Sequence, residues 1–262
     1  MIEPRIGLAL GGGAARGLAH LGVFQVLEEN NIPIHYLAGT SAGALMGALY
    51  AGGLDPRYLE KLAEHTSWAH LARLTVPRRG LVATGKLETF INTLLQSKSF
   101  DQLRIPLAVT AVDLKTGRLC VIQEGNVARA VRASSSIPGI FEPLAVGDML
   151  LVDGGVRQSV PISVCRSMGA QVVIAVDLNS LPSRSVEPHS IFQVILLSLD
   201  ILQREAVEND LKEADILVQP DLSQFSPADL DHVAEIVEAG RRATEAKLPE
   251  IRAAIKRWQV PE

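Results

Sequence analysis

A Gly-x-Ser-x-Gly segment between two apolar runs constrains the fold of this chain more than any other feature. Gly39-Thr40-Ser41-Ala42-Gly43 follows the apolar run 34–38 and precedes a run of small and apolar residues over 42–52. A strand that turns sharply into a helix through this pattern is a nucleophile elbow, in which the serine has strained backbone angles. Side chains at Gly39 or Gly43 would collide across such a turn. A glycine-rich turn before a closely packed helix would have the same letters.

Apolar runs typical of strands alternate with helical patterns along the whole chain. Such alternation is typical of an α/β fold with a mostly parallel sheet that is covered by helices on both faces. The sequence contains no repeat, low-complexity tract or linker, so we expect residues 1–262 to form one domain. The expected strands are 6–10, 34–38, 105–112, 118–123, 149–152, 171–176 and 215–219, and the expected helices are 18–30, 42–52, 55–65, 84–95, 127–133, 162–168, 190–211 and 227–257.

Composition argues against several classes of protein. The net charge of the 262 residues is −4 and no long basic run occurs, which argues against nucleic-acid binding. Cys120 and Cys165 are too few for a disulfide scaffold or a cysteine zinc site. No uncharged apolar run reaches the ~20 residues of a membrane-spanning helix, and Met1–Arg5 contains no apolar signal region. We therefore expect a cytoplasmic protein that contacts a membrane, if at all, from one side.

A glycine-rich loop, Gly11-Gly12-Gly13-Ala14-Ala15-Arg16-Gly17, follows the first expected strand. A dinucleotide fingerprint would need glycine at position 16, and a P-loop would need Lys-Ser or Lys-Thr where Leu18-Ala19 stand, so both nucleotide interpretations are weak. The third interpretation is an oxyanion hole. Bare amides of Gly11, Gly12 and Gly13 would stabilise the negative oxygen formed when Ser41 attacks an ester carbonyl. Arg16 either adds positive charge there or braces the loop.

A nucleophilic Ser41 also needs a base, because a free hydroxyl is a poor nucleophile near neutral pH. A Ser-Asp-His triad would draw on the downstream His189 or His232, of which His189, in a loop after a strand, is the better candidate. The alternative base is Asp153, at a strand end before two glycines. Burial would raise its pKa from about 3.9, and hydrogen bonds from glycine amides would lower it. An Asp-Gly turn without a catalytic role has the same letters, so the residues alone leave the base open.

Several short motifs together resemble the patatin-like phospholipase family, and most closely its small single-domain bacterial members. Each motif is weak alone, but all occur in the family's order and spacing over nearly the whole chain. They are Gly11–Gly17 with Leu18–Val23, Gly39–Gly43, Ile105–Leu107 with Asp113-Leu114, Ala133–Pro138 with Phe141 and Pro143, and Asp153-Gly154-Gly155.

The resemblance implies a three-layer α/β sandwich with a mostly parallel central sheet. It also implies a Ser–Asp dyad, in which Ser41 is the nucleophile, Asp153 is the general base, and no histidine takes part. The Gly11–Gly13 amides would form the oxyanion hole, while the role of Arg16 is not fixed. The implied reaction is hydrolysis of fatty-acyl esters of lipids, of phospholipase A, lysophospholipase or esterase type, through an acyl-Ser41 intermediate. No metal and no organic cofactor is implied.

Two other functions stay open beside this one. One is a regulatory or lipid-binding protein of the same fold with little turnover, and the other is an acyltransferase or thioesterase. The expected partners are a lipid acyl ester and, transiently, a membrane surface.

The irregular segment 66–84 is the candidate for that membrane contact. It mixes Trp68 and leucines with Arg73, Arg78 and Arg79, a composition suited to an anionic lipid surface. We hypothesise a mobile cap over the site, with an ordinary surface loop as the alternative. The apolar run Ile191–Leu197 is expected to be a buried helix face rather than a lipid anchor.

Overall fold

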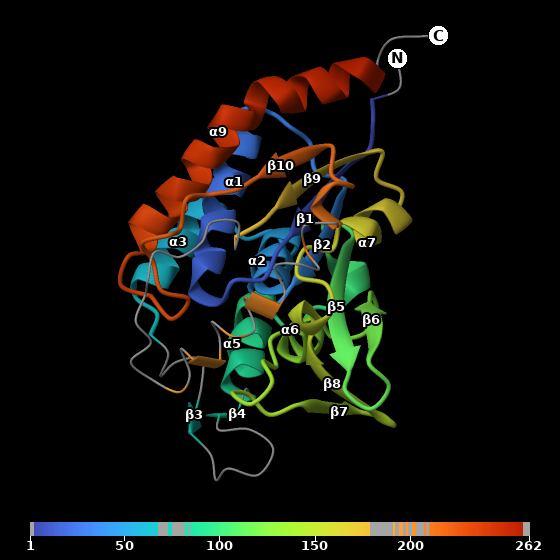
Figure 1. Cartoon of the computed structure of the whole chain (residues 1–262), viewed down its shortest axis with the longest axis vertical. Coiled ribbons are helices and arrows are strands. Elements are labelled where there is room, and N and C mark those ends of the chain that lie inside the picture. The colour runs from blue at the N-terminus through green and yellow to red at the C-terminus, as the bar shows by residue number, and fades with distance from the viewer. Residues whose placement is uncertain are drawn as a thin grey trace.

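A mixed β-sheet flanked by helices organises the computed structural model (Figure 1). The structure describes residues 3–67, 73–74, 82–83, 85–178 and 210–258, together with single residues between 191 and 207. Of the expected elements, most of the segment 66–84, the loop with His189 and most of the helix 190–211 therefore lie outside the described residues. The described Ile191 and Val194 are 64% and 47% exposed, so for them the prediction of a buried helix face is wrong.

The main sheet has the strand order β10-β9-β1-β2-β5-β8-β7, and β6 pairs with β5 as well. The strands β1, β2, β5, β9 and β10 are mutually parallel, as predicted, whereas β6, β7 and β8 are antiparallel to their neighbours. A separate antiparallel pair joins β3 and β4. The bounds are β1 Ile6–Leu10, β2 Tyr36–Thr40, β3 Arg73–Leu74, β4 Val82–Ala83, β5 Leu107–Asp113, β6 Arg118–Ile122, β7 Leu144–Val146, β8 Met149–Asp153, β9 Val172–Val176 and β10 Ile216–Val218.

Helices follow most of the strands, and their bounds agree with the predicted ones to within a few residues at most ends. The exception is α9, which begins at Val233 instead of 227, because the carbonyl of Pro227 accepts a hydrogen bond from the amide of Ala15 and that segment holds the glycine loop. The helices are α1 Ala19–Glu29, α2 Ala42–Ala51, α3 Pro56–Glu64, α5 Gly85–Leu95, α6 Val127–Ser134, α7 Ile162–Ser167 and α9 Val233–Trp258, with 3₁₀ turns η1 Ala14–Leu18, η2 Phe100–Gln102 and η3 Gly154–Val156.

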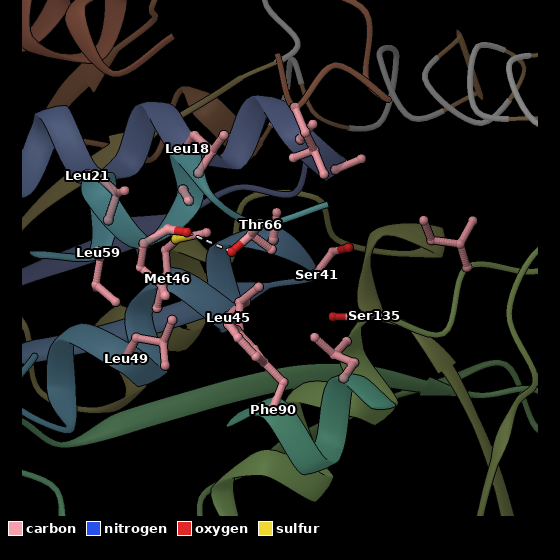
Figure 2. Close-up of a pocket in the computed structure, with 18 of the residues that line it drawn as sticks. Leu18, Leu21, Ser41, Leu45, Met46, Leu49, Leu59, Thr66, Phe90 and Ser135 are labelled. Carbon is pink, nitrogen blue, oxygen red and sulfur yellow. Dashed lines mark hydrogen bonds between the residues drawn. The ribbon is translucent and has the colours of Figure 1, made fainter. Parts of the chain in front are cut away.

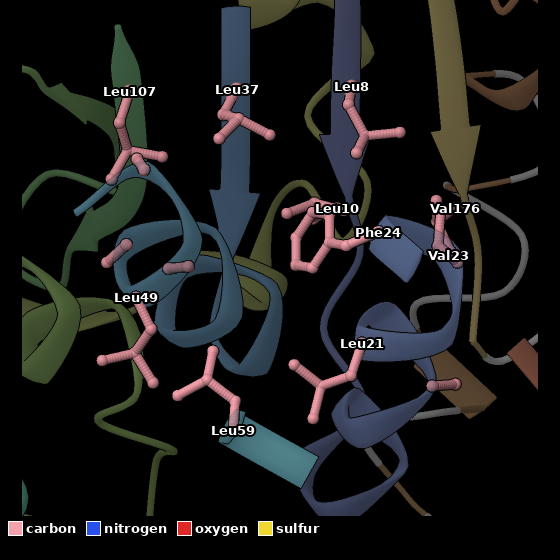
Figure 3. Close-up of a cluster of buried hydrophobic side chains, with 14 of the residues drawn as sticks. Leu8, Leu10, Leu21, Val23, Phe24, Leu37, Leu49, Leu59, Leu107 and Val176 are labelled. Atoms are coloured by element: carbon pink, nitrogen blue, oxygen red, sulfur yellow. The ribbon is translucent and has the colours of Figure 1, made fainter. Parts of the chain in front are cut away.

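The two faces of the sheet carry side chains of different size. Leu8, Leu37 and Leu107 point from neighbouring strands toward α1 and α2, where Phe24 and Leu49 meet them (Figure 3). On the opposite face each of the same strands contributes an alanine, Ala9, Ala38 and Ala108, to a cluster with Ile162 and Cys165 of α7, and these small side chains leave room for that short helix. Within the described residues, no helix is both long and apolar enough to cross a membrane.

Candidate active site

The predicted elbow is present at the junction of β2 and α2. Ser41 has φ 52° and ψ −119°, a left-handed conformation that costs a non-glycine residue free energy, and it caps the N-terminus of α2. A Cβ atom on Gly39 would lie 2.6 Å from the amide nitrogen of Ala44, and one on Gly43 would lie 2.2 Å from the carbonyl oxygen of Leu10. Both glycines are therefore required, as the motif predicted.

The register of the sheet brings Ser41 to Asp153. β2 pairs with β5 up to Thr40 opposite Thr110, and β8 pairs with β5 from Asp153 opposite Ala111 onward. β2 and β8 therefore end at neighbouring positions of β5, which places Ser41, directly after β2, near Asp153, the last residue of β8. The hydroxyls of Thr40 and Thr110, both fully buried, are 2.7 Å apart and join β2 to β5 next to Ser41.

Asp153 is buried, 6% exposed, and it interacts with Ser41. Burial raises the pKa of the carboxyl to about 6, against hydrogen bonds from the Ser41 hydroxyl and the Gly155 amide that lower it. The Gly155 amide donates to Oδ1 of Asp153 over 2.8 Å. A Cβ atom on Gly154 would lie 2.4 Å from Oγ1 of Thr110, so the turn after Asp153 needs glycine to pack this closely on β5. Above pH 6 the carboxylate predominates and is placed to accept a proton from Ser41.

The glycine loop lies against the elbow, but two of its three predicted donors have acceptors already. A Cβ atom on Gly12 would lie 3.4 Å from Cβ of Ser41. The amide of Gly11 donates to the carbonyl oxygen of Val176 over 3.0 Å, and that of Gly12 donates to Ser159 over 3.1 Å. These bonds contradict the expectation of three bare amides. Within the described residues, the amide of Gly13 donates to no acceptor.

Arg16 and His20 fix the glycine loop through hydrogen bonds to backbone carbonyls. Arg16 is buried, and its Nε donates to the carbonyl oxygen of Phe225 over 2.9 Å, which favours the bracing role over a role in charge stabilisation. His20, to which no sequence motif assigned a role, is fully buried in α1. Its Nε2 lies 2.9 Å from the carbonyl oxygen of Gly11, and burial lowers its pKa to about 4, so the neutral ring donates this bond. The sequence feature that could have indicated this contact is the position of His20 in the first turn of the helix that follows the loop.

Of the other polar candidates, His232 and Asp113 bind partners away from Ser41. His232 is exposed and hydrogen-bonds Asp229, which raises its pKa, and His189 lies outside the described residues. Asp113 accepts hydrogen bonds from the amide of Leu150 and the hydroxyl of Thr116, which lower its pKa, so it serves its own turn. Among the described residues, no group of three His, Cys, Asp or Glu side chains could hold a metal ion.

An apolar pocket extends from Ser41 between α1, α2, α3 and α5 (Figure 2). Its polar lining residues are Ser41, Thr66 and Ser135, and the hydroxyl of Thr66 donates to the carbonyl of Leu62 in the preceding helical turn. Ser41 and Ser135 lie together at one end, and leucines fill the other (Figure 2). The apolar lining consists of Ala14, Ala15, Leu18, Leu21, Ala42, Leu45, Met46, Leu49, Leu59, Leu62, Ala63, Leu87, Phe90, Ile137, Phe141 and Leu230.

The chain matches the model of a known protein family over more than half of its length. The family model described as patatin-like phospholipase matches residues 8–166, which include the glycine loop, the elbow and the turn after β8. This chain belongs to the patatin-like phospholipase family. The resemblance inferred from the motifs is thereby confirmed.

Two curated proteins are similar in sequence to about 70% of this chain. An uncharacterized NTE family protein of Mycobacterium tuberculosis is 35% identical over 199 residues, which are 71% of this chain and 53% of that protein. Lysophospholipase NTE1 of Mycosarcoma maydis is 35% identical over 188 residues, 69% of this chain and 10% of that protein. The chain thus spans about half the length, or less, of these curated relatives.

A solved structure shares the fold of this family member at low sequence identity. The crystal structure of VipD from Legionella pneumophila aligns with a TM-score of 0.55 and 12% identity. The alignment covers 96% of this chain and 67% of that one. The patatin-like α/β fold predicted from the motifs is therefore present.

Proposed function

We propose that residues 1–262 act as one hydrolase domain that cleaves fatty-acyl esters of lipids through an acyl-Ser41 intermediate. The observation that carries the proposal is the buried Ser41–Asp153 pair, of which Ser41 lines one end of an apolar pocket. Membership of the patatin-like phospholipase family and similarity to a protein named lysophospholipase support it. Lysophospholipids, with one fatty-acyl ester, are accordingly the first substrate class to test.

The proposed reaction has two proton transfers in each half. Asp153 accepts the proton of the Ser41 hydroxyl as Oγ attacks the ester carbonyl carbon, and the protonated carboxyl then gives that proton to the departing alcohol. Water repeats the sequence on the acyl-serine, so that Asp153 takes a proton from water and Ser41 leaves with it, releasing the fatty acid. The developing oxyanion faces the unengaged amide of Gly13, beside the start of η1. Gly11 and Gly12 shape the loop in this scheme.

A fluorophosphonate probe and a lysophospholipid substrate test the proposal together. Wild-type protein is expected to be labelled and to release fatty acid, and Ser41→Ala is expected to lose both, with hydrolysis reduced at least about 10⁴-fold because no other group forms the acyl intermediate. Analysis of the products separates hydrolysis from acyl transfer to another acceptor. A wild-type protein that neither reacts with the probe nor turns over any acyl ester would leave the regulatory or lipid-binding function in its place.

The apolar pocket predicts a dependence on acyl-chain length. Leu45 lies on α2 inside the pocket (Figure 2), so Leu45→Trp is expected to fill the space for a long chain. Hydrolysis of a dodecanoyl ester should fall at least about tenfold relative to a butanoyl ester, because several methylenes lose their apolar site at about 0.8 kcal/mol each. Leu114→Trp, at an exposed position outside the pocket, is the control. Equal effects of Leu45→Trp on both esters would place the chain elsewhere.

Transient contact with a lipid surface is the remaining part of the proposal. It rests on the sequence of the segment 66–84, whose arginines suit anionic headgroups. Reversing Arg78 and Arg79 to glutamate is expected to weaken binding to anionic vesicles by at least about tenfold, at roughly 1 kcal/mol for each basic residue near the surface. The control variant reverses the exposed Arg242 and Arg257 of α9, which changes the net charge equally. Equal vesicle sedimentation by both variants would reject this segment as the contact.

A further inference from the structure

The backbone of Ser41 is held by a side chain that the proposed reaction does not use. The amide of Ser41 donates a hydrogen bond to Oγ of Ser134 over 2.8 Å. Ser134 is the last residue of α6 and is fully buried. Ser134 is far from the elbow in the sequence. Its hydroxyl oxygen accepts the hydrogen bond of the backbone N–H group of Ser41 itself.

The same stretch holds the backbone of Asp153. The amide of Asp153 donates to the carbonyl oxygen of Ser136 over 3.0 Å. Ser135, between the two, lines the apolar pocket next to Ser41 (Figure 2). The hydroxyl of Ser136 donates back to the carbonyl of Arg132, so the stretch is tied to the last turn of α6. Three consecutive serines therefore contact Ser41, the pocket and Asp153 in turn.

The hydrogen bonds from the amides of Ser41 and Asp153 fix the backbone of the two residues whose side chains must be aligned. Ser41 is in a strained left-handed conformation, and such conformations persist only where the surroundings fix them. Removing the acceptor would leave the Ser41 amide buried without a partner, which favours a rearranged elbow. Because Asp153 is held by the same stretch, a shift of Ser134–Ser136 changes the position of one member of the pair relative to the other.

We propose that Ser134 is a positioning residue and that Ser134–Ser136 form a clamp that sets the Ser41 hydroxyl against the Asp153 carboxylate. The clamp rests on the proposed hydrolase function, since its purpose is the alignment of the two reacting groups. Ser134, which is fully buried, acts through the backbone amide of Ser41, and Ser136 acts through the backbone amide of Asp153. The expected signature is therefore a loss in the chemical step without loss of substrate binding.

Ser134→Ala tests the clamp. We expect kcat for lysophospholipid hydrolysis to fall about 10- to 100-fold with KM changed less than about threefold, because small misplacements of reacting groups have effects of this size. The rate of fluorophosphonate labelling at saturating probe should fall by the same factor. Ser134→Thr keeps the hydroxyl and should recover most of the rate. Ser134→Cys, with a similar volume and a weaker acceptor, takes the place of the alanine variant if that variant does not fold.

Thr244→Ala is the matched control, because it also removes a fully buried hydroxyl, which in α9 donates to the carbonyl of Gly240. Rates are taken per folded molecule, from thermal unfolding of each variant. If wild-type protein reacts and Ser134→Ala reacts at the same rate, or loses no more rate than Thr244→Ala, the clamp is wrong and the hydrolase function stands. If wild-type protein shows neither labelling nor hydrolysis, the proposed function itself fails.

Discussion

Asp153→Asn is expected to lower kcat for ester hydrolysis by about 10²- to 10⁴-fold, the usual contribution of a general base. Asparagine keeps the shape of the side chain and can still accept the Gly155 amide, but it takes no proton from Ser41. The measurement is steady-state release of fatty acid from a lysophospholipid. Asp113→Asn is the control, since Asp113 is a similarly buried carboxylate that serves a turn, and it should retain activity per folded molecule.

The pH profile gives the Asp153 prediction a second readout. With the pKa of the base raised to about 6 by burial, kcat/KM of the wild type should fall about tenfold per pH unit below pH 6 and level off above it. The residual activity of Asp153→Asn should lack that step. If Asp153→Asn retains full activity while His189→Ala abolishes it, the base is a histidine and the dyad is wrong.

The same substitution should stabilise the fold, which separates loss of a base from loss of structure. A carboxyl whose pKa is raised in the folded state contributes stability below its unfolded value of 3.8 and loses it as pH rises through about 6. Above pH 6 the folded protein therefore carries the cost of a buried charge. Removing that charge with Asn should raise the free energy of unfolding by up to about 3 kcal/mol at pH 7.5, and by little at pH 4.

Gly43→Ala is expected to destabilise the fold by more than about 4 kcal/mol, or to prevent folding altogether. The added Cβ atom would lie 2.2 Å from the carbonyl oxygen of Leu10 and 2.7 Å from that of Gly11, both of them backbone atoms that cannot rotate away. Relief requires β1 or α2 to move, and either movement opens the elbow. Urea unfolding, with soluble yield as the first measure, checks the prediction.

Gly85→Ala provides the comparison for Gly43→Ala. A Cβ atom at Gly85, the first residue of α5, meets nothing within 4 Å. Alanine there should leave stability unchanged or raise it by up to about 1 kcal/mol, through its better helix propensity. A soluble Gly43→Ala protein with the unfolding midpoint of the wild type would show that the elbow tolerates a side chain at this position.

The sequence predicted the parts of the fold that local patterns determine. The strand 6–10 has the predicted bounds, and the elbow has the predicted strain, because a short apolar run and glycine spacing act over a few residues. Asp153 was predicted at the end of a strand, and the sheet was predicted to be mostly parallel. Its strand β8 is instead antiparallel and reaches the same level from the other direction. No local pattern in 149–153 distinguishes the two directions.

The partners of the site groups were beyond prediction for the same reason. The acceptors for the amides of Gly11 and Gly12 are the carbonyls of Val176 and Ser159, far along the chain. The serines after α6 could be identified as a loop, but the contact of Ser134 with Ser41 depends on how α6 packs near α2. Backbone acceptors leave no signature in side-chain spacing, so bare and engaged glycine amides look alike in sequence.

The place of β1 in the sheet has a consequence for biosynthesis. β1 precedes the other described strands in the chain, yet it lies between β2 and β9, and β9 ends only at Val176. Until β9 has emerged from the ribosome, one edge of β1 is unpaired, and the Gly11 amide lacks its acceptor, the carbonyl of Val176. The elbow and the base are both synthesised earlier. A nascent chain that ends before β9 would therefore carry Ser41 and Asp153 beside an open, adhesive strand, a state in which premature pairing with other chains competes with folding.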